Sequence, residues 1–256
     1  MRLAVFGDIH GNLTALDAAL DDMKRAGAVD LLWCLGDLAA LGGGARECIR
    51  RLSALREELG KDKFKVIGGN TDRYLVTGER FPMSPPQEEA EYAAYRDNIL
   101  SMSAIYEWNM AQLAWDDFQL LNTILGRELR QRVEGYGMVI GVHAIPGDDE
   151  GMSLRPDSSE EEAADALLDR QGRLALCGHT HLAMDREVGG WRVINPGSVG
   201  LSFSNPGLAE WALLEWKDGA LEVQLRTVPY DVEAALRQWE ASGYPRIDWI
   251  RGRIGV

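Results

Sequence analysis

The chain has few cysteines and no long apolar run. The first shortage argues against a disulfide-bonded protein and the second against a membrane-spanning one. Cys34, Cys48 and Cys177 are the only cysteines in 256 residues, show no CxxC spacing, and lie within apolar runs or helical stripes. An odd number in such settings is typical of reduced core residues. No apolar run approaches the ~20 residues that span a bilayer, and the chain enters a strand without signal-peptide features. We therefore expect a cytoplasmic protein without a membrane partner.

Positive charge is also scarce. Lys and Arg number 27 against 40 Asp and Glu, which gives a formal net charge of −13 at pH 7. This balance excludes the basic footprint of a nucleic-acid-binding protein. An anionic substrate must then be attracted locally, and bound metal ions would supply that attraction. With 46% hydrophobic and 26% charged residues, we expect a soluble enzyme that forms a single domain over residues 1–256.

Histidine is rare, and each of the four histidines follows a short apolar run beside a glycine or a turn. The first run, at residues 3–6, leads through Asp8 and His10 to a helical stripe that begins at Leu13. In an open α/β sheet such a loop lies at the carboxyl end of a strand, where these folds bind ligands. A carboxylate beside an imidazole suits Zn, Mn or Fe better than Ca or Mg. Taken alone, however, Asp-x-His is more often a helix-capping Asp beside an exposed His.

The same arrangement recurs along the chain. Short apolar runs predict further strands at 30–35, 64–67, 139–142 and 174–177. Glycine turns and alternation predict strands from 182, at 191–194 and at 212–216, a last one at 221–226 with Leu221, Val223 and Leu225 buried, and a helix from about 231. The opening β-α-β-α-β run favours a parallel sheet covered by helices, with its polar strand ends side by side.

Three prolines, Pro82, Pro85 and Pro86, interrupt this pattern, and we expect a helical cap insertion over about 82–130. Aromatic residues of the insertion either line a substrate pocket or, as we expect, pack it against the main body. These residues are Tyr92, Tyr95, Trp108 and Trp115. Trp239, Tyr244 and Trp249 near the carboxyl end pose the same choice between packing, which we favour, and a homo-oligomer contact.

The polar strand ends form an ordered set of motifs. In chain order they are Asp8-Ile9-His10, Gly36-Asp37, Gly69-Asn70-Thr71-Asp72, His143 and Gly178-His179-Thr180-His181. This set resembles the calcineurin-like metallophosphoesterase superfamily, whose pattern is Asp-x-His, Gly-Asp, Gly-Asn-x-Asp/Glu, a lone His after a strand, and Gly-His-x-His. The turn Asn195-Pro196-Gly197-Ser198 and the closing hairpin resemble its small prokaryotic phosphodiesterase branch. The likeness thus covers nearly the whole chain.

The resemblance implies a fold and a metal centre. The fold, of class α/β (α+β), would be a four-layer αββα sandwich of two mixed β-sheets flanked by helices. The cofactors would be two divalent transition-metal ions, Mn or else Fe, Zn or Ni. By this resemblance Asp8, His10 and His181 hold one ion, Asn70, His143 and His179 hold the other, and Asp37 bridges them. A hydroxide that bridges the ions would attack the phosphate ester while the ions neutralise the phosphoryl oxygens.

One position departs from the family pattern. Many members carry a histidine after the Asn of the third block, where it protonates the leaving oxygen, but this chain has Thr71. A hydroxyl is a poor proton donor at neutral pH, which favours diesters with good leaving groups. Asp72, which would orient that histidine, is expected to be structural. Arg73 is the cation nearest the cluster and either contacts a phosphate oxygen or pairs with a carboxylate.

The sequence therefore predicts a metal-dependent hydrolase of small-molecule phosphate esters, with phosphodiesters favoured. The alternatives within this class are a phosphomonoesterase, a protein phosphatase and a dinucleoside polyphosphate phosphatase. An alternative from another class is a non-catalytic scaffold of the same fold, such as a subunit of an endosomal trafficking coat. A scaffold need not keep metal-binding side chains, whereas every ligand position here holds one, and this favours the enzyme.

Overall fold

The computed structural model describes residues 1–255, which form two β-sheets and the helices that cover them. The strands are β1 (Arg2–Phe6), β2 (Leu31–Cys34), β3 (Phe64–Val66), β4 (Leu129–Val133), β5 (Gly137–Gly141), β6 (Leu174–Leu176), β7 (Met184–Val188), β8 (Trp191–Asn195), β9 (Leu208–Lys217) and β10 (Ala220–Pro229). The helices are α1 (Leu13–Ala26), α2 (Ala45–Leu59), α3 (Asn70–Thr77), α4 (Glu89–Gln112), α5 (Trp115–Ile124), α6 (Glu160–Ala166), α7 (Val232–Ala241) and α8 (Ile247–Arg251).

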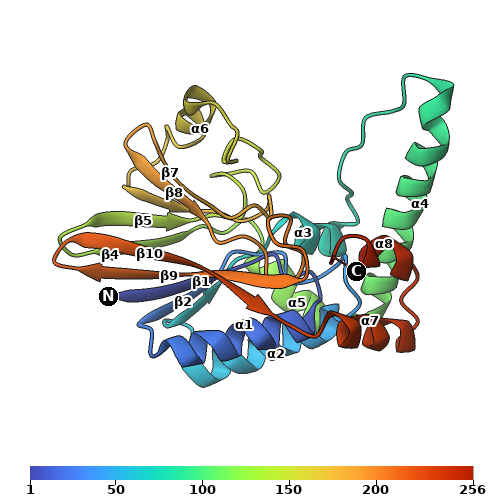
Figure 1. Ribbon diagram of the computed structural model, residues 1–256, viewed down its shortest axis with the longest axis horizontal. Helices are drawn as coiled ribbons and strands as arrows, with labels where there is room; N and C mark the ends of the chain where they lie inside the picture. Colours follow the sequence, from blue (N-terminus) through green and yellow to red (C-terminus); the bar gives the residue numbers. More distant parts are fainter. Residues whose placement is uncertain (256) are drawn as a thin grey trace.

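Both sheets are five-stranded and mixed. The first has the order β10-β9-β1-β2-β3 and the second the order β4-β5-β6-β8-β7. In the first, β1, β2 and β3 are parallel, and β9 and β10 complete the sheet as antiparallel strands. In the second, β5, β6 and β8 are parallel, with β4 and β7 antiparallel at the edges. Figure 1 shows the two sheets stacked, with α1 and α2 below them and α6 above. The αββα sandwich that the family resemblance implied is confirmed.

The core lies on both faces of each sheet. In β1 the side chains of Leu3 and Val5 pack between the sheets, whereas Ala4 and Phe6 pack in the cluster that includes the buried residues of α1 and α2. This alternation follows from the two-residue repeat of a strand. Because both faces are buried, the strand reads as a continuous apolar run in the sequence. The three cysteines are free and buried, and burial raises their thiol pKa, as expected of core residues.

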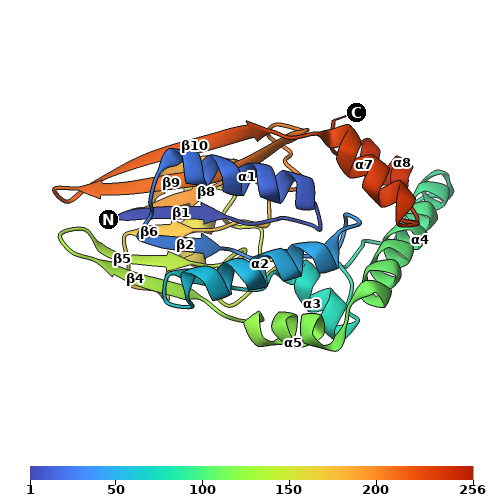
Figure 2. The same ribbon diagram turned by 90° about the horizontal axis from the view of Figure 1, so that it is seen from below.

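Helices α4 and α5 lie within the range expected for the helical insertion, and α4 forms an arm that projects from the sandwich (Figures 1 and 2). Figure 2 shows the carboxyl-terminal helices α7 and α8 beside this arm, on the side of the molecule opposite the amino terminus. The division of the chain into one domain with a cap stays a prediction. Within residues 1–255 no helix has the length and apolarity needed to cross a membrane.

The structure corrects one expectation about burial. Leu225 of β10, expected on the buried face of the hairpin, is 41% exposed. It lies at the edge of the sheet, since β10 has β9 as its neighbour on one side and no strand on the other among residues 1–255. Alternation therefore identified this strand, but it did not reveal how much of its apolar face another layer covers.

Candidate metal centre

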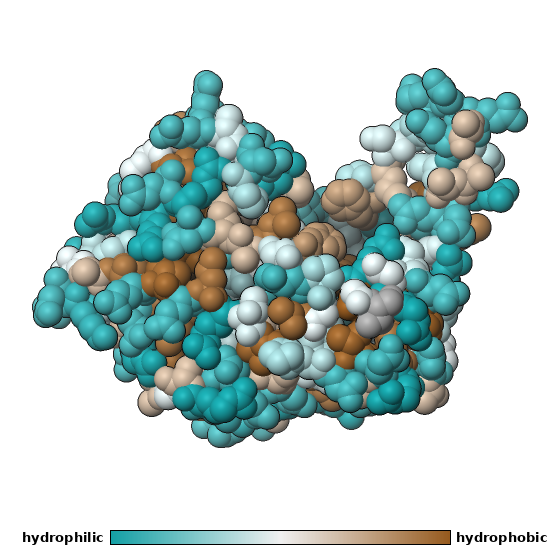
Figure 3. Space-filling model, viewed as in Figure 1, coloured by the Kyte–Doolittle hydropathy of each residue, from teal (hydrophilic) through white to brown (hydrophobic). Residues whose placement is uncertain are grey.

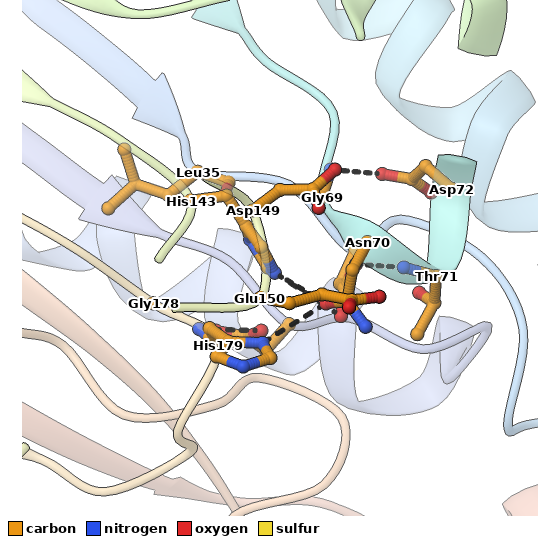
Figure 4. A network of polar contacts seen from close by, with 12 residues as sticks. Leu35, Gly69, Asn70, Thr71, Asp72, His143, Asp149, Glu150, Gly178 and His179 are labelled. Atoms are coloured by element: carbon orange, nitrogen blue, oxygen red, sulfur yellow. Dashed lines mark hydrogen bonds and ion pairs between the residues drawn. The ribbon is translucent and has the colours of Figure 1, made fainter. Parts of the chain in front are cut away.

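The loops that follow β1, β2, β3, β5 and β6 bring the predicted ligands to one end of the sandwich. Asp8, His10, Asp37 and His181 each offer a donor atom, and these atoms all lie within 4.8 Å of one another. Asn70, at the start of α3, lies with His143 and His179 beside this group (Figure 4). The predicted ligands from both sheets are thus brought together: Asp8, His10, Asp37, Asn70, His143, His179 and His181.

Five of these residues have an unusual backbone conformation. Their φ values lie in the left-handed region, which residues other than glycine rarely adopt. The values are 52° for Asp8, 49° for His10, 52° for Asp37, 66° for His179 and 56° for His181. Backbone bonds between loops hold the turns, for example from the amides of Asp8 and His10 to the carbonyls of Gly36 and Asp37, each 2.9 Å long. Such left-handed residues cluster at functional sites, where the surrounding structure enforces them.

Two backbone carbonyls orient imidazole rings of the cluster. His143 Nδ1 lies 2.8 Å from the carbonyl oxygen of Leu35, and His181 Nδ1 lies 2.7 Å from that of Leu201. A carbonyl only accepts hydrogen bonds, so each Nδ1 carries a ring proton, and Nε2 is the nitrogen that a neutral ring would offer to a metal ion. Metal-binding histidines are typically held in this way by a partner on the other ring nitrogen.

Asp37 lies between two groups of ligands. Its Oδ1 accepts a hydrogen bond from the Thr71 amide at 2.9 Å, while its Oδ2 lies 3.6 Å from His10 Nε2 and 3.5 Å from His143 Nε2. On one side, His181 Nε2 lies 2.9 Å from His10 Nε2. On the other side, Asn70 Oδ1 lies 3.0 Å from His143 Nε2 and 3.1 Å from His179 Nδ1, and Figure 4 shows both rings pointing at Asn70.

Burial and neighbouring charges set the protonation of the cluster. Burial works to raise the pKa of Asp8, but its histidine neighbours, led by His181, outweigh burial and lower that pKa to about 2. Burial lowers the pKa of His10 well below its usual value, and burial with the nearby His143 lowers that of His179 to about 3. Burial works to lower the pKa of His143, but the neighbouring carboxylates outweigh burial and raise that pKa. An ionised Asp8 beside neutral His10 and His179 matches the deprotonated donors that metal binding requires.

The donor atoms fit a divalent transition metal. His10 Nε2 and His181 Nε2 face each other at 2.9 Å, and the proton of His181 is held on Nδ1. His10 Nδ1 is buried without a hydrogen-bond partner within the described part of the chain. The other nitrogen of that ring, Nε2, faces the cluster, and a divalent transition metal accepts such mixed imidazole and carboxylate donors.

Carboxylates hold the Arg73 guanidinium. It donates to Asp149, with the Nη2–Oδ1 distance at 2.8 Å, and also to Glu150 and Glu79. These carboxylates raise the pKa of Arg73 further, with the Asp149 hydrogen bond as the main cause. Of the two alternatives left open by the sequence, the structure therefore shows carboxylate pairing. The acidic loop at 148–150 serves this pairing through Asp149 and Glu150.

Thr71 and Asp72 are both engaged in structural bonds. The hydroxyl of Thr71 donates to the carbonyl oxygen of Ala39 at 3.0 Å. The buried carboxylate of Asp72 accepts from the amides of Leu38, Ala39 and Gly69 at 3.0 to 3.2 Å. It thereby ties the loop after β2 to the start of α3, so that Asp37 and Asn70 stay in register.

A cavity of about 510 Å³ opens over the ligand cluster. His10, Asp37 and Asn70 line its floor, and apolar side chains that include Tyr106, Phe203 and Trp249 line its sides. In Figure 3 the surface is hollowed between the α4 arm and the main body. Sequence analysis did not consider Tyr106 and Phe203, because they come from separate segments and carry no motif. It assigned Trp249 to packing, and this side chain both packs against the core and lines the cavity.

The aromatic residues that it did consider in the insertion do not line this cavity. Tyr92 and Trp115 are exposed, whereas Trp108 packs edge to face on Tyr244 with ring centroids 5.5 Å apart. The expected packing therefore holds for Trp108 and fails for Tyr92 and Trp115. Trp239 and Tyr244 are buried in the core, as favoured.

Comparison with known proteins gives a consistent family. A curated relative, an uncharacterised protein of Methanocaldococcus jannaschii, is 25% identical over 268 residues, which cover 98% of this chain and 96% of the relative. The crystal structure of a metallophosphoesterase from Sphaerobacter thermophilus superimposes with a TM-score of 0.70 at 24% identity, over 99% of this chain and 98% of that one, and shows the same fold.

A second kind of relative matches only in part. A symmetrical bis(5'-nucleosyl)-tetraphosphatase of Sodalis glossinidius is 36% identical over 76 residues, which cover 30% of this chain and 25% of that enzyme. The model of the calcineurin-like phosphoesterase superfamily domain, in contrast, matches residues 1–219. Its match covers strands β1 to β9 and every predicted ligand, and it ends just before β10. The chain therefore belongs to the calcineurin-like phosphoesterase superfamily.

Proposed function

We propose that this protein is a two-metal phosphoesterase that hydrolyses small-molecule phosphate esters and prefers diesters. The observation that carries the proposal is the position of Asp37 Oδ2, 3.6 Å from His10 Nε2 and 3.5 Å from His143 Nε2. A carboxylate so placed is suited to be shared by two cations. We assign Asp8, His10 and His181 to one ion, and Asn70, His143 and His179 to the other.

Two bound divalent cations supply a water-derived nucleophile near neutral pH and neutralise charge on the phosphoryl oxygens. The chain's own residues prepare the site for them. The carbonyl oxygens of Leu35 and Leu201 accept hydrogen bonds from Nδ1 of His143 and His181, so that Nε2 of each ring is the nitrogen that would bind a metal ion. Mn, Fe, Zn and Ni all accept this donor set, and affinity alone does not select among them; we propose Mn for turnover.

The preference for diesters follows from Thr71. Its hydroxyl donates to Ala39, so the position that holds a leaving-group histidine in many relatives offers no free proton donor. Substrates whose leaving oxygen needs little protonation, such as aryl phosphodiesters, are then favoured. The apolar sides of the cavity, with Tyr106 and Phe203, suit the aryl portion of such a substrate.

The test is hydrolysis of bis-p-nitrophenyl phosphate against p-nitrophenyl phosphate, with Mn and with chelator, together with metal content by mass spectrometry. We expect Mn-dependent turnover that favours the diester, lowered at least ~100-fold in Asp37→Ala and His143→Ala. The exposed Asp169→Ala serves as the matched control and should keep both activity and metal content. Two bound ions without turnover on any ester would instead support the non-catalytic scaffold.

A second candidate is hydrolysis of dinucleoside polyphosphates. The partial match to a symmetrical bis(5'-nucleosyl)-tetraphosphatase favours it, although the matched segment is only 25% of that enzyme's length. Diadenosine tetraphosphate included in the same assay separates the two candidates. Faster Mn-dependent turnover of this compound than of bis-p-nitrophenyl phosphate would favour the second one.

A further inference from the structure

Two arginine side chains line the cavity beside the ligand cluster. Arg80 follows α3 and is half-buried, whereas Arg253 follows α8 and is more exposed. Both segments lie outside the motifs that carry the metal ligands. In a chain with a net charge of −13, two cations in the same cavity are an unusual local concentration of positive charge.

Neither guanidinium has a carboxylate partner among residues 1–255. Two other arginines of this end of the molecule do: Arg73 pairs with Asp149 at 2.8 Å, and Arg246 with Asp97 at 3.2 Å. Burial without a counter-ion lowers the pKa of Arg253, because partial loss of water disfavours its charged form. An anion in the cavity would relieve this cost.

Aromatic rings and main-chain carbonyls fix the position of both groups. The Arg80 guanidinium lies 4.8 Å from the ring centroid of Tyr106, and that of Arg253 lies 3.8 Å from the centroid of Trp249. Arg80 Nη1 donates to the carbonyl of Glu79 at 2.7 Å, and Arg253 Nη1 donates to that of Trp249 at 2.9 Å.

These bonds leave most of each guanidinium unused. A guanidinium has five N–H groups, and in both residues Nε and Nη2 have no protein acceptor within the described residues. Guanidinium groups held beside a ring, with N–H groups that have no protein acceptor, are suited to bind phosphate or carboxylate.

We propose that Arg80 and Arg253 form an anion-binding subsite, which binds a second phosphate or carboxylate group of a substrate whose esterified phosphate lies at the Asp37 cluster. The inference rests on the proposed function for the position of the ester. The rings of Tyr106, Phe203 and Trp249 line the same cavity and would contact an apolar, planar part between the two anions. The substrate class is thus a phosphate ester with a planar body and an additional negative charge.

The experiment uses phosphonates, which carry a P–C bond and are not hydrolysed as esters. Two matched pairs differ only by one carboxylate: phenylphosphonate with 4-carboxyphenylphosphonate, and biphenyl-4-phosphonate with 4'-carboxybiphenyl-4-phosphonate. Titration calorimetry on the Mn-loaded full chain gives a Kd for each compound. Arg80→Met and Arg253→Met remove one guanidinium each and keep much of the apolar stem, while Arg246→Met removes a paired arginine outside the cavity as a control.

For at least one length we expect the carboxylate compound to bind about tenfold more tightly to the wild type, which corresponds to about 1.4 kcal/mol. The ratio of the two Kd values within a pair should fall towards one in Arg80→Met and in Arg253→Met, and it should stay near ten in Arg246→Met. Arg80→Gln and Arg253→Gln give the same comparison if a Met variant fails to fold. Equal affinities within both pairs, or a preference that survives both substitutions, would overturn the subsite alone. Binding of none of the phosphonates would overturn the two-metal proposal as well.

Discussion

The floor and the wall of the cavity differ in how they are built. The floor consists of side chains at strand ends, and Asp37, Asn70 and His181 are at most 5% exposed. The wall comes from the segment after α3, from α4, from the loop after β8 and from the carboxyl-terminal segment, and its Phe203 is 53% exposed. Floor residues are fixed by hydrogen bonds from neighbouring loops, whereas the described wall contacts are mainly ring against ring.

We infer from this difference that the floor carries the proposed chemistry and that the wall determines which substrates bind. A floor buried in the sandwich holds donor atoms in one geometry, which metal binding requires. A wall of separate, partly exposed segments can vary without disturbing the sheets, which is typical of the loops that determine specificity on a shared fold. Substitutions in the floor should therefore affect metal content and turnover, and those in the wall should affect substrate affinity.

The largest effect is expected for Gly69→Ala in the floor. A Cβ atom there would overlap Asp37 Oδ1 and lie 2.7 Å from His143 Nδ1, so the added methyl would displace two of the proposed metal ligands. The φ of Gly69, −111°, suits any residue, so the effect is steric and not a matter of backbone strain. We expect loss of bound metal and at least ~100-fold lower turnover. Gly252→Ala is the control, because its Cβ would meet only the Asp248 carbonyl oxygen at 3.9 Å, an ordinary van der Waals contact. A Gly69→Ala protein with full metal content would contradict the prediction.

A somewhat smaller effect is expected below the floor, at Asp72. Its carboxylate accepts from the amides of Leu38, Ala39 and Gly69, and Asp72→Ala leaves these buried donors without their partner. Each unsatisfied buried donor costs ~1–3 kcal/mol, so we expect a loss of roughly 3 kcal/mol or more in the free energy of unfolding, measured by urea denaturation. Asp72→Asn keeps the shape and one acceptor oxygen, so it should lose less. Equal stability of the wild type and Asp72→Ala would show that water replaces the carboxylate.

In the wall, Phe203→Ala should have a moderate and selective effect. The Phe203 ring lies over His181 with centroids 4.8 Å apart and is half open to the cavity. We expect KM for bis-p-nitrophenyl phosphate to rise about three- to tenfold, because an aryl contact is worth ~0.5–1.5 kcal/mol, with little change in kcat or metal content. A drop in kcat with unchanged KM would instead place Phe203 with the floor. Leu100→Ala on the exposed part of α4, outside the cavity, is a control for surface truncation.

The same division explains what the sequence could predict. The floor could be predicted from the sequence, because each proposed ligand lies in the loop, turn or helix start that follows a buried strand. The family motifs also fix the order of Asp8, Asp37 and His143 along the chain. The wall was not, because Tyr106 and Trp249 come together only through tertiary packing of α4 against the carboxyl-terminal segment. Strand β4 was also missed, since its burial pattern has apolar residues only at its ends, Leu129 and Val133.

The smallest effect is expected for Asp22, which lies outside both the floor and the wall. There, the pH dependence of the unfolding free energy can be compared with the pH at which metal is released. Asp22 accepts hydrogen bonds from Arg226 and Trp211, and the bond from Arg226 is the main reason why its pKa lies below the usual value. Because the folded state holds the charged form, its contribution is present above the unfolded pKa of ~3.9 and is lost as pH falls through the lower folded value. Asp22→Asn should cost less than ~1 kcal/mol of unfolding free energy at pH 6, since the group is partly exposed, and this difference should shrink as pH falls below ~3.9 and vanish once the folded carboxylate is protonated. Metal release should begin at higher pH than this change, because protons compete directly for the imidazole donors of the floor. Metal loss and unfolding that coincide at every pH in both proteins would mean that the floor and the sandwich are one cooperative unit.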